Sequence, residues 1–382
     1  MRSSFRLGKI AGIDIGIHYS WLLAFIIITW SLAQGFFPQV YPGWSTVTYW
    51  VTGILATLLL FVSVLLHELA HSLVARARGM PVSSITLFIF GGVSNLTEEA
   101  KMPGIEFTMA VVGPLTSLIL AGIFWLLSHL ISNQLSPAAA ILNYLALINA
   151  VLCVFNLLPG FPLDGGRVLR SILWRTTGSL TRATNIAATV GRLFGWAFIA
   201  FGIYQLFQGN FLGGLWIAFI GWFLGSAADA SRRETTLRDQ LSGARVKDMM
   251  YTDIETITPE TSVEEVVWDI FRQRHRRAVP VCQDGRPAGI VTIADVKELP
   301  REQWSQTPVS EIMTREPLYS VTPEDELNTA LQIIAQHDLN QVMVLDQGQC
   351  VGLLSRADII QYLQFNQELG MKSKPEAKER QR

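Results

Sequence analysis

The sequence predicts a multi-pass α-helical membrane domain of about six spans, followed by a soluble α/β domain. Half of the 382 residues are hydrophobic and only 16% are charged. Residues 1–230 carry 18 Lys, Arg, Asp and Glu side chains, whereas the last 152 residues carry 43. A membrane part is therefore followed by a part with the charge density of an ordinary soluble protein. The net charge of −1 argues against nucleic acid as a partner.

Six mostly apolar stretches are candidates for membrane spans, since a helical span needs roughly 17–25 residues. The positions of Lys and Arg predict their orientation, because these residues lie in the N-terminal arm and in alternate connections, while the three other connections contain none. Both termini are expected in the cytoplasm, with the chain in a cell membrane or a plastid- or thylakoid-type membrane. The start of the first span also resembles a secretory signal ending at Ser31-Leu32-Ala33, but the apolar run continues through Phe37 and favours a retained span. The expected spans are 17–37, 49–74, 107–131, 138–158, 193–207 and 211–230.

The pentapeptide His67-Glu68-Leu69-Ala70-His71 lies inside an apolar run, residues 51–74. On a helix, residues i and i+4 share one face, so His67 and His71 can present two imidazoles to one metal ion. Glu68 is placed to act on a water molecule held by that metal. Ionisable side chains inside a membrane are costly and normally mark function. The pattern predicts a zinc hydrolase site built inside a membrane.

A catalytic zinc ion needs a third protein ligand and an open fourth position. After the fourth span, prolines and a glycine within residues 159–162 break the helix, which lets the backbone turn a side chain back into the bundle. Asp164 is the expected third ligand, although it could instead cap a short helix that begins near Gly165. Zinc would lower the pKa of its bound water, and Glu68 could accept that proton and pass it to the leaving amine.

The pentapeptide and the motif of residues 156–165, Asn-x-x-Pro-x-x-Pro-Leu-Asp-Gly, together resemble the site-2 protease family of intramembrane zinc metalloproteases. The resemblance covers about residues 10–230. It implies hydrolysis of a peptide bond in or near the transmembrane helix of a single-span membrane protein, such as an anti-sigma-type factor, in regulated intramembrane proteolysis. It also implies that His67, His71 and Asp164 bind one Zn²⁺ ion and that Glu68 is the catalytic base.

Two further features belong to this resemblance. The family's asparagine corresponds to Asn156, with a role in holding the scissile carbonyl or orienting the site. A neutral amide near a developing oxyanion is physically reasonable, and a hydrogen bond between spans is an equally good account. Gly113-Pro114 resembles another family element, and its direct physical meaning is a kink or close helix packing.

The connection after the second span is expected to form a small membrane-associated β-hairpin. Residues 84–96 are β-branched and aromatic and then turn at Gly91-Gly92. A substrate helix must unwind before it is cut, so an exposed strand edge could receive it by main-chain pairing. A hairpin that merely packs at the membrane surface is the alternative. Glu98, Glu99 and Glu106, which follow, are expected to be solvated or interfacial acids.

The soluble half contains a repeat. Val246-Lys-Asp-Met-Met and Val309-Ser-Glu-Ile-Met open two similar segments, each with a Thr-Pro turn, an amphipathic helix and short apolar strands. This pattern resembles a tandem pair of CBS domains. The expected organisation is a protease domain at 1–230, a linker at 231–245, CBS domains at about 246–300 and 309–366, and a disordered tail at 367–382.

CBS pairs commonly bind adenine nucleotides, so the resemblance implies ATP, ADP or AMP as a regulatory ligand. The closing motifs would hold phosphate and ribose through Thr292, Asp295, Ser355 and Asp358. The alternative is that these residues only cap helices in a purely structural or dimerising module. A dimerising module would form a homodimer through the CBS domains. Arg272, Arg274, Arg276 and Arg277 could steer anions or form a solvated helix end.

Two other functional classes compete with the protease. CBS pairs also occur in transporters and channels, but a conduction path would show polar residues repeated along several spans. A sensor that had lost turnover would depart from the catalytic pattern, and this sequence does not. Cys153, Cys282 and Cys350 have no metal-type spacing and are expected to be free packing thiols.

Overall fold

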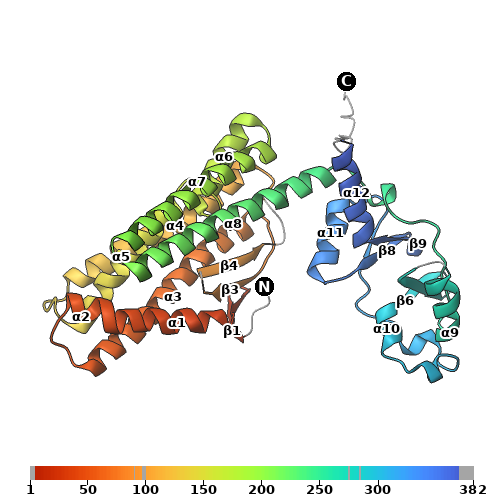
Figure 1. Ribbon diagram of the computed structural model, residues 1–382, viewed down its shortest axis with the longest axis horizontal. Helices are drawn as coiled ribbons and strands as arrows, with labels where there is room; N and C mark the ends of the chain where they lie inside the picture. Colours follow the sequence, from red (N-terminus) through yellow and green to blue (C-terminus); the bar gives the residue numbers. More distant parts are fainter. Residues whose placement is uncertain (1–4, 90, 97–99, 274–275, 284, 370–382) are drawn as a thin grey trace. The chain divides into compact units, whose positions relative to one another are not determined.

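The computed structural model describes residues 5–369, except 90, 97–99, 274–275 and 284. The chain divides into two compact units with the boundary after Thr235, and each unit is described by itself (Figure 1). Of the expected disordered tail, the first residues belong to the last helix, α12, which runs from Arg356 to Glu368. The tail after residue 369 lies outside the described residues.

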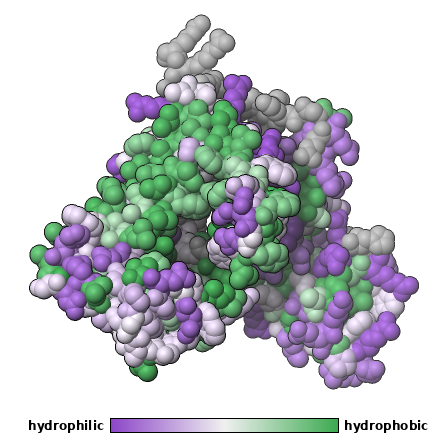
Figure 2. All heavy atoms as spheres, turned by 60° about the vertical axis from the view of Figure 1, so that its left-hand side comes forward, coloured by the Kyte–Doolittle hydropathy of each residue, from purple (hydrophilic) through white to green (hydrophobic). Residues whose placement is uncertain are grey.

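The first unit is a bundle of long apolar helices. In the described part of the chain, six helical stretches are long and apolar enough to cross a membrane. Their outward-facing side chains are largely hydrophobic, and Figure 2 shows such side chains gathered on the surface of the molecule. The helices are α1 (Ser20–Ser31), which continues through the π-helix η1 (Leu32–Phe36) and α2 (Phe37–Val40), then α3 (Thr46–Ala77), α4 (Pro103–His129), α5 (Pro137–Asn156), α6 (Asp164–Thr177), α7 (Leu180–Phe207) and α8 (Phe211–Leu241).

The number of spans is confirmed, but the helices that contain the last two spans are longer than the expected spans. α7 begins at Leu180, so Arg182 and Arg192 lie on the helix and not in a connection. α8 continues to Leu241. A helix does not end where the hydrocarbon ends, so hydrophobicity alone could not locate these boundaries. The expected connection before α7 contains the short amphipathic helix α6.

The β-hairpin is confirmed as β3 (Val82–Phe88) and β4 (Gly91–Leu96), but it belongs to a larger sheet. The N-terminal arm forms β1 (Phe5–Ile10) and β2 (Ile13–Ile17), which the prediction missed, and β2 pairs in parallel with β3. The strand order is β1-β2-β3-β4, which leaves β4 at one edge. Buried isoleucines of β2 and β3 pack against Leu65 and Leu69, so the sheet lies beside the part of α3 that contains the pentapeptide.

The second unit contains two similar βα repeats with separate cores. The first repeat has α9 (Val263–Glu265), which continues as the π-helix η3 (Val266–Arg272), then β5 (Ala278–Gln283), β6 (Arg286–Thr292) and α10 (Ile293–Lys297). The second has β7 (Ser320–Val321), α11 (Leu327–Gln336), β8 (Gln341–Asp346), β9 (Gln349–Ser355) and α12. Short 3₁₀ turns are η2 (Val246–Asp248), η4 (Arg301–Gln303) and η5 (Val309–Glu311).

The opening segments of the two repeats are exchanged. Val246 belongs to the core of the second repeat, and Val309 belongs to the core of the first. Main-chain bridges join Tyr251 to Leu353 and Ile290 to Thr314 in the same crosswise manner. The exchange joins the two repeats into one compact unit, which the sequence repeat alone did not reveal.

Candidate active site

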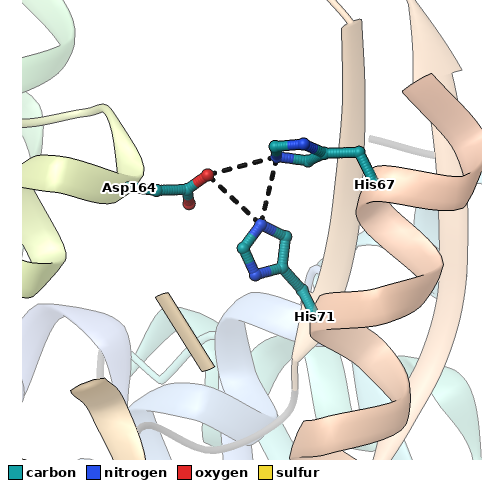
Figure 3. A group of neighbouring side chains, drawn as sticks. All are labelled: His67, His71 and Asp164. Carbon is teal, nitrogen blue, oxygen red and sulfur yellow. Dashed lines mark hydrogen bonds and ion pairs between the residues drawn. The ribbon is translucent and has the colours of Figure 1, made fainter. Parts of the chain in front are cut away.

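Two histidines and an aspartate that are far apart in the sequence converge on one point. His67 and His71 lie one turn apart on α3, and Asp164 is the first residue of α6. Figure 3 shows the carboxylate of Asp164 facing both imidazole rings. Asp164 Oδ2 lies 3.1 Å from His67 Nε2 and 3.2 Å from His71 Nε2, and the two Nε2 atoms are 3.2 Å apart. Both histidines are buried.

These separations fit a single zinc ion. Zinc binds His nitrogen and carboxylate oxygen at about 2.0–2.2 Å in tetrahedral geometry, which places neighbouring ligand atoms about 3.3 Å apart. His71 Nδ1 donates a hydrogen bond of 2.6 Å to the carbonyl oxygen of Met109, so Nε2 of the neutral ring carries a lone pair. A lone pair that faces a carboxylate oxygen at 3.2 Å needs a cation or a proton between the two atoms. The donor set is therefore suited to a metal ion.

α4 supports both rings from the other side. His67 Nδ1 lies 2.9 Å from Ser117 Oγ, and the Met109 carbonyl accepts from His71. Ser117 and Met109 are eight residues apart, which places them on one face of α4. Hydrogen bonds of this kind orient the ring of a ligating histidine and fix which nitrogen is free for the metal.

Gly113 lies midway between these two residues on the same face. A Cβ atom at this position would stand 2.1 Å from His71 Nε2 and 2.6 Å from His67 Nε2. A side chain here would therefore occupy the space next to both nitrogens, which a metal ion bound to them would also need. The missing side chain at position 113 thus leaves open the space that the ion requires.

Asp164 reaches the histidines because the chain turns sharply before it. α5 ends at Asn156 and α6 begins at Asp164, where the prolines and glycine of the motif predicted a break. A Cβ atom on Gly165 or Gly166 would lie within 2.4 Å of backbone atoms of the turn, so only glycine permits this close packing. Leu163, and not Asp164, is the N-cap residue of α6, and the Asp164 carboxylate faces the two histidines, which argues against the capping alternative.

Glu68 is held by the edge strand β4. Its Oε2 accepts a hydrogen bond of 3.1 Å from Ser94 Oγ, and Ser94 Oγ lies 3.0 Å from Ser72 Oγ. Gly92 packs directly on this side chain, since a Cβ atom there would meet Glu68 Cγ at 2.3 Å. The strand that precedes the third span therefore fixes the carboxylate next to the two histidines.

Asn156 is half-buried at the C-terminal end of α5, eight residues before Asp164. The hydrogen bonds that the structure gives to His67, His71 and Asp164 do not involve it. Its position beside the turn is established, and its part in the chemistry stays a prediction.

The expectation for Glu106 was wrong. This residue is fully buried on α4, where Oε1 accepts a hydrogen bond of 2.6 Å from Arg170 Nε on α6. The charge is not solvated because helices pack around it and Arg170 neutralises it. Sequence reasoning also missed Ser117 and Ser94, since single serines carry no recognisable signal. Glu98 and Glu99 lie outside the described residues.

The second unit contains a cavity of about 1020 Å³ between its two repeats. Arg276 and Arg277 line it, and the guanidinium of Arg276 lies 3.5 Å from the ring centroid of Tyr251. Arg272 instead lies over the Trp268 ring, and Arg274 falls outside the described residues. Of the four expected nucleotide-binding residues, the cavity is lined by Thr292, Ser355 and Asp358.

Asp295 is not among the residues that line this cavity. Its Oδ2 accepts hydrogen bonds from the backbone N–H and the hydroxyl of Thr292, at 2.7 and 2.8 Å. Asp358 accepts the equivalent bonds from Ser355, at 3.0 and 2.7 Å. Both closing motifs therefore cap helices, which agrees with the alternative that these residues have a capping role. Three of the four residues also line the cavity.

Comparisons with known proteins cover both units. The model of peptidase family M50 matches residues 55–139 and 131–198, and the CBS domain model matches residues 246–302 and 309–364. A Synechocystis sp. protein named as a zinc metalloprotease is 35% identical over 95% of this chain and 96% of its own length. Rip3 of Mycobacterium tuberculosis, also named as a zinc metalloprotease, is 36% identical over 94% and 92%.

Among solved structures, the site-2 protease from Methanocaldococcus jannaschii is 29% identical over 60% of this chain and 95% of its own, with a TM-score of 0.43. The identity to the two zinc metalloproteases extends over nearly the whole length of both partners. The resemblance found in the motifs is thus confirmed. The chain belongs to peptidase family M50, the site-2 protease family, and is an integral membrane zinc metalloprotease with tandem CBS domains.

Proposed function

We propose that the protein is an intramembrane endopeptidase in which His67, His71 and Asp164 would hold one catalytic zinc ion. The observation that carries this proposal is the convergence of two imidazole nitrogens and one carboxylate oxygen at separations of 3.1–3.2 Å. A purely structural ion pair would not require the gap that Gly113 leaves beside both nitrogens. Whole-length identity to zinc metalloproteases favours this function over a transporter or channel.

The catalytic roles follow from the positions of the side chains. A bound zinc ion acts as a Lewis acid, which acidifies water and polarises a carbonyl. Glu68 accepts the proton of the attacking water and then delivers it to the leaving amine as the C–N bond breaks. The Ser94 hydroxyl keeps the Glu68 carboxylate oriented through its hydrogen bond. Asn156 donates from its amide to the scissile carbonyl or to a group that orients it.

The substrate is proposed to be a single-span membrane protein, such as an anti-sigma-type factor, cut in regulated intramembrane proteolysis. An unwound segment of its helix can pair with the outer edge of β4, because β4 is the edge strand of its sheet. Ser94 and Gly92 of this strand touch Glu68, so a paired segment would pass beside the base. The charge pattern supports an orientation with both termini in the cytoplasm.

Cleavage in proteoliposomes tests the assignment. A single-span candidate substrate is incubated with the wild type, Glu68→Gln and Asp164→Asn, and zinc is measured in the same samples. Glu68→Gln should abolish cleavage and keep zinc, whereas Asp164→Asn should abolish cleavage and weaken zinc binding. Asp229→Asn, a half-exposed aspartate on α8, is the matched control and should cleave normally. Cleavage that survives either of the first two changes would refute the roles.

We further propose that an adenine nucleotide binds the cavity of the CBS pair and modulates cleavage. Thr292 and Ser355 hydroxyls, the Asp358 carboxylate and the arginines at 276 and 277 supply groups suited to ribose and phosphate. Asp295 holds the Thr292 hydroxyl in place. The CBS pair is also the proposed site of homodimerisation.

Calorimetry with ATP, ADP and AMP on the full chain, together with cleavage rates, tests the nucleotide. Asp358→Ala should weaken binding by at least ~10-fold, in line with the loss of a hydrogen bond to a charged group. Asp346→Ala, at the end of β8, is the control. Light scattering of the same samples gives the oligomeric state. If none of the three nucleotides binds, or if binding leaves the rate unchanged, the modulation is disproved.

A further inference from the structure

A buried ion pair joins the two helices that flank the metal ligands. Glu106 on α4 is fully buried, and Arg170 on α6 is 6% exposed. Arg170 bonds Glu106 Oε1 through Nε at 2.6 Å and also contacts it through a terminal nitrogen. Arg167 approaches the same oxygen only to 3.9 Å. Glu106 Oε2 has no hydrogen-bond partner among the described residues.

The pair links the two halves of the site. Glu106 is one turn before Met109 on α4, and Met109 accepts the hydrogen bond from His71. Arg170 is six residues after Asp164 on α6. Its guanidinium also lies 4.9 Å from the ring centroid of Phe161, in the turn that leads to Asp164. One arginine thus touches the helix that supports the histidines and the turn that presents the aspartate.

The ion pair can fix the position of Asp164 relative to the two histidines. The two histidines share one helix, so their spacing is fixed by helical geometry. Asp164 comes from a separate helix, and its distance to them depends on how α6 sits against α4. A metal site tolerates ligand displacements of only about 0.2 Å. Close packing at the glycines prevents α6 from moving nearer to its neighbours but does not prevent it from moving away. An ion pair between α4 and α6 opposes movement in both directions.

Burying two charges is also a costly way to obtain stability. An apolar pair of similar size is often as stabilising or more so, so a buried ion pair suggests a geometric purpose. We propose that Glu106 and Arg170 are positioning residues that hold Asp164 at coordination distance from His67 and His71. This inference rests on the ligand set of the proposed function.

The test is zinc affinity of the purified full-length protein in detergent, with the absorption spectrum of the cobalt-substituted protein as a second readout. Glu106→Gln/Arg170→Met removes both charges at nearly constant volume, so no unpaired buried charge remains. We expect zinc affinity to fall by about 10–100-fold, as for other groups that orient a ligand. The cobalt spectrum should shift toward that of Asp164→Asn. Arg175→Gln, an exposed arginine on the same helix, should change neither.

A double-mutant cycle separates positioning from general damage. In an Asp164→Asn background, the Glu106/Arg170 change should cause no further loss of zinc affinity, because the ligand that it positions is already gone. An equal loss in both backgrounds, or unchanged affinity in the first, overturns the inference. Arg170→Lys with Glu106 intact retains the charge, so its zinc affinity should lie between those of the double variant and the wild type. Affinity as low as that of the double variant counts against the inference. If Asp164→Asn alone leaves zinc affinity unchanged, it is the ligand set of the proposed function that fails.

Discussion

Gly113→Ala is the smallest change that should empty the metal site. The added methyl group would stand 2.1 Å from His71 Nε2, 2.5 Å from His71 Cε1 and 2.6 Å from His67 Nε2. Ordinary contacts between such atoms require about 3.5 Å. Both rings are held from behind by Ser117 and Met109, so they cannot retreat without losing their hydrogen bonds.

The size of the effect follows from the required movement. His71 Nε2 must shift by more than about 1 Å to restore a normal contact. Ligand distances in metal sites hold to about 0.2 Å, so His71 would cease to bind. Disturbing a group that merely orients a ligand costs about 10–100-fold in metal affinity, and losing a ligand outright should cost at least about 100-fold. Cleavage should fall in proportion to the zinc that is lost.

Zinc content and competition with a chelator measure this effect directly. Gly122→Ala is the matched control, because Gly122 is on the same helix and a Cβ atom there meets nothing within 4 Å. It should keep wild-type zinc affinity and cleavage. The reasoning is refuted if Gly113→Ala binds zinc with wild-type affinity, because the space beside the two nitrogens would then not be the metal position.

Three further predictions concern other parts of the chain. Ser94→Ala removes the hydrogen bond to Glu68 and should lower kcat about 10-fold with zinc content and KM unchanged; equal kcat would show that the base needs no such support. Gly352→Ala places a Cβ atom 3.0 Å from the backbone oxygen of Tyr251 and 3.1 Å from Met250 Sδ. This overpacking should destabilise the CBS unit by about 1–2 kcal/mol, visible as a lower Tm; an unchanged Tm contradicts it. The pKa of the Cys350 thiol is raised from 9.0 to about 11, mainly because the thiol is buried and secondly because the Cys282 thiol lies nearby. Alkylation of the native thiol should therefore stay slow at pH 9 and accelerate toward pH 11. The free energy of unfolding should fall over this range, because the thiol ionises at lower pH in the unfolded chain. Equal alkylation rates of native and unfolded protein at pH 9 would contradict the burial.

The ligands of the site were predictable because their chemistry is unusual where they occur. His67, Glu68 and His71 stand out in an apolar run, and helical spacing places the two histidines on one face. Asp164 could be proposed because few acids lie near the spans and a helix break precedes it. These inferences needed only local rules, and the structure brings the three expected ligands within hydrogen-bonding distance of one another.

Features that depend on long-range packing were not predictable. The parallel pairing of β2 with β3 joins segments about 70 residues apart. A local sequence pattern can indicate each strand, but it does not indicate which strands pair. The exchange of opening segments between the CBS repeats was likewise not predictable, because Val246 and Val309 occupy equivalent positions in the two repeats, and the sequence does not show which core each one joins. Burial of Glu106 was missed because its partner, Arg170, follows 64 residues later.

One face of α4 supports the metal ligands, although it supplies no ligand itself. Glu106, Met109, Gly113 and Ser117 follow one another at helical spacing, and each contacts a different part of the site. None is a candidate ligand or base, and an ordinary apolar span would accept other residues at every one of these positions. Because this single face both orients the histidines and is tied to the helix of Asp164, a rotation of α4 by a fraction of a turn would disturb all three ligands together. Substitutions along this face should therefore reduce zinc affinity, whereas substitutions on its lipid-facing side, such as at Leu118 or Ile119, should not.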